Sequence, residues 1–257
     1  MKRSSRELKR IARDFLNNRY SIPMGAFVIA GIITAIIETP FSLLLHDYPS
    51  VFQIVTSLLA YYLITLIGLV LNIGIISVHL NMSRGSKFGL KQIIEPFLHN
   101  TERYFLLSFL FSLSALFSCI PLIGCGFFFY LYDGKTITAP VLIFAGVLTA
   151  ILLISVILNY GLVFFLLLDQ PDAKVTSLFH KSRLIMKKNK GRFLYLLLSL
   201  LPWCIPIFCS FGIASLWLCP YMTQIFTVFY LDCTGELNQI PVRNYAAESE
   251  QSETPRF

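Results

Sequence analysis

Three carboxamide side chains are the polar groups whose spacing most suggests chemistry in this sequence. Asn72, Asn159 and Gln224 each interrupt a long apolar stretch. The next polar boundary follows nine, ten and eight residues later, at Asn81, Asp169 and Asp232. On continuous helices these intervals place all three amides at one level, about 12–15 Å from the boundary and near mid-membrane. Because an amide carries no charge, the pattern favours hydrogen bonds between helices over a polar cluster that binds a solute or an ion.

Glu38 is the only acid well inside an apolar stretch. A carboxylate at that depth suggests a proton or cation role, but sixteen residues of helix from Ile22 place it about 24 Å along, near the outer headgroups. There a solvated carboxylate is ordinary, and this interpretation is favoured. The remaining candidate ligands are too dispersed for a metal site, and no Ser, His and Asp grouping indicates a hydrolase. They are His46, Asp47 and His79. We therefore expect no metal, no cofactor and no enzymatic activity.

These polar residues lie on elements that the apolar composition defines. Hydrophobic residues make up 56% of the 257, and the stretch from Val51 to Leu80 contains no Asp, Glu, Lys or Arg. A bilayer needs only about 20 such residues. The sequence predicts an all-α membrane protein with six transmembrane helices, over residues 22–45, 51–80, 104–132, 139–168, 193–210 and 212–231. The last two are separated by a short turn with Pro202, Pro206 and Gly212, and the alternative is one long bent helix.

The basic residues lie on one side of these spans. Of 21 Lys and Arg, only Lys135 falls in an alternate connection, which leaves twenty on the other side. This asymmetry is the positive-inside pattern, so we expect a multi-pass plasma-membrane protein with both termini in the cytoplasm. The net charge of +7 then indicates contact with anionic lipid headgroups and no nucleic-acid binding.

The segment before the first span has the pattern of an amphipathic helix. Leu8, Ile11 and Leu16 share one face, and Ser4 with Glu7 forms a capping box at its start. The pattern predicts a helix that lies on the inner membrane surface with its basic face toward the headgroups. Here and in the third basic segment, the predicted headgroup contacts are Arg6, Lys9, Arg10, Arg13, Lys181, Lys187 and Lys188.

A similar stripe precedes the third and fifth spans, which suggests an internal repeat. The junction arginines Arg19, Arg103 and Arg192 are 84 and 89 residues apart. A proline recurs late in each outgoing span, at Pro40, Pro121 and Pro206. We favour three parallel repeats of an amphipathic surface helix plus a helical hairpin, over residues 4–80, 86–168 and 172–231. The alternative is that juxtamembrane helices simply look alike. Together the repeats would form one transmembrane domain, 1–232, followed by a disordered cytoplasmic tail, 233–257.

Several short motifs carry a family resemblance. They include Ser5-Arg6-Glu7-Leu8-Lys9, Asp169-Gln170-Pro171-Asp172, Ser182-Arg183-Leu184-Ile185-Met186-Lys187 and Leu216-Trp217-Leu218-Cys219-Pro220-Tyr221. The sequence resembles an uncharacterised family of polytopic integral membrane proteins, a domain of unknown function that is frequent in Gram-positive bacteria. The resemblance implies a bacterial plasma-membrane protein and assigns no functional residues.

Two function classes remain after these exclusions. The favoured one is a non-enzymatic scaffold or accessory component of the envelope, whose basic surface helices bind anionic lipid or a protein that the sequence does not identify. The alternative is a small-solute or ion transporter that uses the mid-membrane amides. The shortage of charged residues at depth favours the scaffold, because coupled transporters usually place ionisable groups there.

Overall fold

The computed structural model of the chain describes residues 3–43, 51–131 and 139–240. Every regular element in these ranges is a helix, which confirms the all-α prediction. Most of the predicted disordered tail lies outside the described residues, as do His46, Asp47 and Lys135 of the predicted outer turns.

The long helices follow the predicted spans. They are α2 (Ser21–Leu43), α3 (Val51–Ser83), α5 (Thr101–Leu131), α6 (Ala139–Tyr160) and α11 (Ser215–Thr234). Shorter elements connect or flank them. These are α1 (Ser5–Leu16), η1 (Leu90–Ile93), α4 (Glu95–Leu98), α7 (Val163–Asp169), α8 (Val175–Lys187), α9 (Lys190–Leu198), η2 (Leu201–Trp203), α10 (Cys204–Cys209) and η3 (Glu236–Asn238).

Among the described residues, five helical segments are long and apolar enough to cross a membrane, as in a multi-pass membrane protein. They are Ser21–Pro40, Phe52–Ser83, Thr101–Phe129, Ala139–Asp169 and Lys190–Cys209. Helix α11, the sixth predicted span, is not among them. Its Gln224, threonines and tyrosines lower its mean hydropathy, and much of its surface is buried by protein. A helix covered by protein does not need the apolar surface that lipid demands.

The chain forms two compact units. The first consists of Met1–His99 together with Leu194–Phe257, and the second of Asn100–Phe193. These boundaries differ from those of the three predicted repeats.

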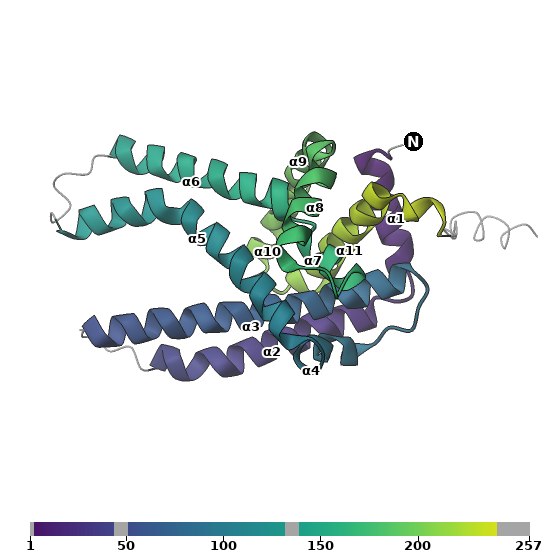
Figure 1. Cartoon of the computed structure of the whole chain (residues 1–257), viewed down its shortest axis with the longest axis horizontal. Coiled ribbons are helices and arrows are strands. Elements are labelled where there is room, and N and C mark those ends of the chain that lie inside the picture. The colour runs from purple at the N-terminus through teal and green to yellow at the C-terminus, as the bar shows by residue number, and fades with distance from the viewer. Residues whose placement is uncertain (1–2, 44–50, 132–138, 241–257) are drawn as a thin grey trace, which may run out of the picture. The chain divides into compact units, whose positions relative to one another are not determined.

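In the first unit, α2 and α3 run side by side, and α11 contacts α1, α2 and α3 (Figure 1). The core between α2, α3 and η1 is made of small and branched side chains that let the helices approach closely. They are Ala26, Ala30, Leu71, Ile75 and Ile93. The third hairpin of the sequence is therefore folded onto the first, with α11 as a central buried element.

Helix α1 begins as predicted but has a different partner. The hydroxyl of Ser4 accepts a hydrogen bond from the backbone N–H of Glu7, which confirms the predicted start. The apolar stripe is buried against α11 (Leu8 is 1% exposed), so the sequence interpretation that it lies on the lipid surface is corrected. The amphipathic pattern is the same for a lipid partner and a protein partner, which is why the sequence did not separate them.

This packing predicts a stability effect for α1. Leu8→Ala removes a fully buried side chain from the contact with α11, and we expect a loss of about 2–5 kcal/mol, as for other buried Leu→Ala changes. The measurement is thermal unfolding of the purified full chain in detergent. Arg6→Ala, at an exposed position on the same helix, is the control and should leave the melting temperature nearly unchanged. Equal melting temperatures for the two variants would contradict the buried position of Leu8.

The second basic segment is not the single amphipathic helix that its spacing predicts. It splits into η1 and α4 at Ile94, and Pro96 lies in the first turn of α4, where its missing backbone N–H costs no helical hydrogen bond. The fold places Ile93 directly against Gly74 of α3. A Cβ at Gly74 would lie 2.6 Å from the Cα of Ile93, so only glycine permits this approach.

The second unit is built on the hairpin of α5 and α6, which lie side by side (Figure 1). The predicted fourth span is interrupted at Gly161, after which α7 begins at Val163. The ring of Phe193 lies 3.4 Å from the position that a Cβ of Gly161 would take. Helix α8 contacts both α6 and α7, with Val175, Leu178, Ser182 and Met186 buried.

Candidate functional site

A buried polar network joins α3 to α11 in the first unit. Nδ1 of His79 lies 2.7 Å from Oε1 of Gln224, and Nε2 of Gln224 donates to Oγ of Ser83 over 2.7 Å. The Ser83 hydroxyl in turn donates to the backbone carbonyl of His79. All three side chains are at most 1% exposed. This network fixes the amide of Gln224 from both ends.

The directions of these bonds assign the histidine tautomer. Because the Ser83 hydroxyl gives its proton to a carbonyl, it must accept from the Gln224 amide, whose oxygen then faces His79. His79 therefore carries its proton on Nδ1. Its Nε2 is buried and has no hydrogen-bond partner among the described residues, so the ring depends on Gln224 for its polar contact.

Asn159 belongs to a different network, in the second unit. Its Oδ1 accepts from Nζ of Lys190 over 2.7 Å, its Nδ2 donates to the carbonyl of Ser155, and its backbone carbonyl accepts from the hydroxyl of Ser182 on α8. Its depth was estimated on a helix continuous to Asp169. Because the helix breaks at Gly161, Asn159 lies one residue before the end of α6, beside the basic helix.

The structure thus gives Gln224 and Asn159 partners other than each other. Asn72 is half-buried on α3, seven residues or about 10 Å of helix before His79, to which Gln224 bonds. The common cluster of the three amides stays a prediction. Glu38 is exposed on α2, seventeen residues after Ser21, at the end that the sequence assigned to the outer headgroups.

The basic face of α1 is divided between two roles. Arg6, Arg10 and Arg13 are exposed, as a headgroup contact requires. Lys9 instead donates from Nζ to the backbone carbonyl of Ser199, just beyond the end of α9. An ammonium is favourable there because the last carbonyls of a helix lack partners and carry partial negative charge. Partial burial lowers the pKa of Lys9. Of the four predicted contacts on α1, Lys9 is therefore engaged within the protein.

A cleft of about 310 Å³ on the second unit collects positive charge. It is lined by His180, Arg183, Leu184, Lys187 and Lys190. The first four lie at i, i+3, i+4 and i+7 on α8, so they share one helix face. No acid lines this cleft, and its chemistry fits an oxyanion such as a phosphate, which Arg and Lys bind through charged hydrogen bonds.

Sequence analysis identified only Lys187 of these cleft residues. The i, i+3, i+7 spacing of His180, Arg183 and Lys187 was the available signal. Of the other predicted contacts, Lys181 is exposed and donates to Oε1 of Gln170, and Lys188 is exposed at the end of α8.

A comparison with protein-family models matches residues 1–236 to one family, described as "Protein of unknown function (DUF975)". The chain belongs to the DUF975 family. No curated protein and no solved structure matches it significantly. Membership confirms the resemblance to an uncharacterised membrane protein family and leaves the activity to be argued from geometry.

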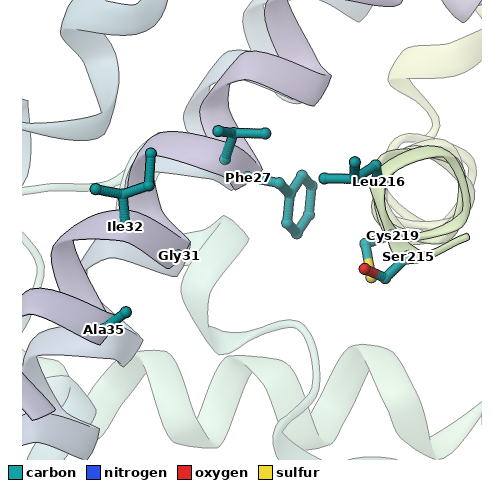
Figure 2. Close-up of a pocket in the computed structure, with 8 residues that line it drawn as sticks. Phe27, Gly31, Ile32, Ala35, Ser215, Leu216 and Cys219 are labelled. Carbon is teal, nitrogen blue, oxygen red and sulfur yellow. The ribbon is translucent and has the colours of Figure 1, made fainter. Parts of the chain in front are cut away.

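This DUF975 member also has an apolar groove of about 410 Å³ between α2 and α11 (Figure 2). Phe27 and Gly31 line it from α2, and Leu216 and Cys219 line it from α11. In Figure 2, α11 is seen nearly end-on while α2 lies across the view, so the two helices cross steeply. No group of three or more His, Cys, Asp or Glu side chains able to hold a metal occurs among the described residues.

Proposed function

We propose that this protein is a non-enzymatic scaffold of the plasma membrane whose basic cytoplasmic surfaces hold anionic phospholipid headgroups. The observation that carries the proposal is the cleft on α8, where His180, Arg183, Lys187 and Lys190 converge without an acid. Both termini and this cleft lie on the cytoplasmic side in the proposal, because twenty of 21 Lys and Arg fall on that side of the predicted spans.

The packing of α1 supports the same function. Since its apolar stripe is sealed against α11, the exposed Arg6, Arg10 and Arg13 are held in a fixed orientation. A rigid basic face loses less entropy on binding a charged surface than a flexible tail does. The attraction is worth about 1 kcal/mol for each Lys or Arg near an anionic membrane.

The polar contacts of the interior favour the scaffold over the transporter. The amides of Gln224 and Asn159 are hydrogen-bonded to groups of their own units, which is the pattern of side chains that stabilise helix packing. A transporter of this size would need such groups to face a water-filled path.

The threefold repeat remains part of the proposal. An asparagine in the left-handed region ends the basic segment before α2 and again before α5, at Asn18 (φ 59°) and Asn100 (φ 53°). The third junction differs, because Asn189 is buried and donates to the carbonyl of Ile185. We propose that the first two units kept the repeated form and that the third diverged.

The lipid proposal is tested with the purified full chain in detergent. Phosphatidylglycerol should raise the melting temperature more than phosphatidylcholine does, because a ligand that binds the folded state stabilises it. Arg183→Gln with Lys187→Gln should weaken phosphatidylglycerol binding about thirtyfold, at roughly 1 kcal/mol per charge and low salt. The matched control is Lys87→Gln with Lys91→Gln, which removes the same charge at exposed positions of the first unit. Equal binding by the two double variants would refute the cleft as the site.

A further inference from the structure

Two hydrogen bonds tie the third hairpin to the side of the membrane where the chain begins. The carbonyl of Ser199 accepts from Lys9, a cation on α1. The carbonyl of Trp217 accepts from the hydroxyl of Tyr20, which directly precedes α2. Burial raises the pKa of Tyr20 to about 12, with a contribution from Tyr221, so this phenol keeps the proton it donates. Both anchors belong to the same compact unit.

The chain between these anchors is too short to cross a bilayer twice. Residues 200–216 comprise 17 residues, whereas each crossing of the hydrocarbon needs about 20 in a helix. Half of this segment, taken as helix, reaches only about 13 Å beyond the anchors. The hydrocarbon region is about 30 Å thick, so the tip ends near its middle.

The other end of α11 is also tied to the side on which α2 begins. Arg84, which follows α3, forms a two-pronged ion pair with Glu236, which follows α11, at 2.6 and 2.7 Å. Gln224, midway along α11, is bonded to His79 and Ser83 near the same end of α3. Helix α11 therefore runs along the ends of α2 and α3, as its steep crossing of α2 also indicates (Figure 2).

The tip itself is suited to hydrocarbon. Phe208 and Phe211 are 91% and 99% exposed, and Ile205 and Ile213 are largely exposed beside them. Residues 193–231 contain no charged side chain, whereas the predicted outer turns of the other two hairpins contain Asp47 and Asp133. Such an exposed aromatic patch is not expected on a turn that lies in water.

The backbone N–H groups of the turn have hydrogen-bond partners within the protein, as they need in lipid. Each backbone N–H from Ser210 to Trp217 donates a hydrogen bond, including that of Ala214 to the hydroxyl of Ser210. Phe211 and Gly212 reverse the chain with positive φ angles of 51° and 88°. Irregular backbone is costly in hydrocarbon because its polar groups have no water to bond to, and the hydrogen bonds of these N–H groups lower that cost for the turn.

We infer that residues 200–216 form a re-entrant hairpin, which inserts its tip into the cytoplasmic leaflet and contacts acyl chains there without crossing the membrane. It replaces the two crossings predicted for residues 193–231, and both termini still share one side. The apolar tip of this hairpin contacts the acyl chains of the cytoplasmic leaflet only. This inference does not depend on the headgroup cleft of α8, so either can fail alone.

The test uses Phe211→Cys in an otherwise cysteine-free full-length chain in right-side-out membrane vesicles. A membrane-impermeant maleimide added outside should leave Phe211→Cys unmodified and should modify Ala139→Cys, at the exposed start of α6. Because Phe211 is 99% exposed on the protein surface, protein packing cannot protect it, so protection means that it lies in lipid or on the inner side. Modification of Phe211→Cys from outside at a rate close to that of Ala139→Cys would overturn the inference.

A second measurement distinguishes lipid burial from a water-exposed position on the inner side. A fluorophore attached to Phe211→Cys with a permeant reagent should be quenched more by a lipid spin-labelled at mid-chain than by one labelled at the headgroup. Ser86→Cys, exposed in the connection after α3, should show the opposite order. Stronger headgroup quenching at position 211 would refute insertion of the tip.

Discussion

Gly74→Ala will destabilise the protein by about 3 kcal/mol, within the range of overpacked interiors. The added Cβ would lie 2.6 Å from both the Cα and the carbonyl oxygen of Ile93 and 2.8 Å from the carbonyl oxygen of Gln92. These are backbone atoms, so η1 must move away from α3 to admit the methyl group. The expected result is a lower melting temperature of the purified chain in detergent.

Gly68→Ala is the matched control on the same helix. A Cβ at Gly68 meets nothing within 4 Å, so we expect an unchanged or slightly higher melting temperature. If both alanine variants melt together, the close approach of Ile93 to α3 is wrong.

Gln224→Leu will cost about 3 kcal/mol, because two buried polar partners each lose a hydrogen bond. Nδ1–H of His79 loses its acceptor and the Ser83 hydroxyl loses a donor, and each unsatisfied buried group costs about 1–3 kcal/mol. The measurement is again thermal unfolding in detergent. Asn72→Leu, at the half-buried amide on α3, is the control and should have a smaller effect.

A double variant separates hydrogen bonding from packing at Gln224. In His79→Phe with Gln224→Leu, both polar groups of the His79–Gln224 contact are absent, so much of the lost stability should return. Strictly additive losses would show that the two side chains are not coupled, contrary to the 2.7 Å contact.

Local signals predicted the helices and the cap at Ser4 well, because apolar runs and capping residues act over a few positions. The partner of each apolar face was not predictable in this way. The stripe of α1 is covered by α11, which lies about 200 residues further along the chain, and an amphipathic pattern has the same form for either partner.

The depth estimated for Asn159 depended on a helix that the structure interrupts. Counting residues from Asp169 assumes a continuous helix, but the chain breaks at Gly161, where the ring of Phe193 lies close to the backbone. The anchors of the third hairpin, from Tyr20 to Trp217 and from Lys9 to Ser199, join residues about 190 positions apart. Nothing in the local composition of residues 193–231 indicates these contacts.

The most direct test of the proposed topology is to determine on which side of the membrane α8 lies. The proposal places the headgroup cleft of α8 and both termini in the cytoplasm. In a cysteine-free background, Thr176→Cys lies at an exposed position of α8, and Ala139→Cys lies at the opposite end of α6. With an impermeant maleimide outside intact right-side-out vesicles, we expect modification of Ala139→Cys alone, and modification of Thr176→Cys only after permeabilisation. Modification of Thr176→Cys in intact vesicles would place the basic surface outside and contradict the account.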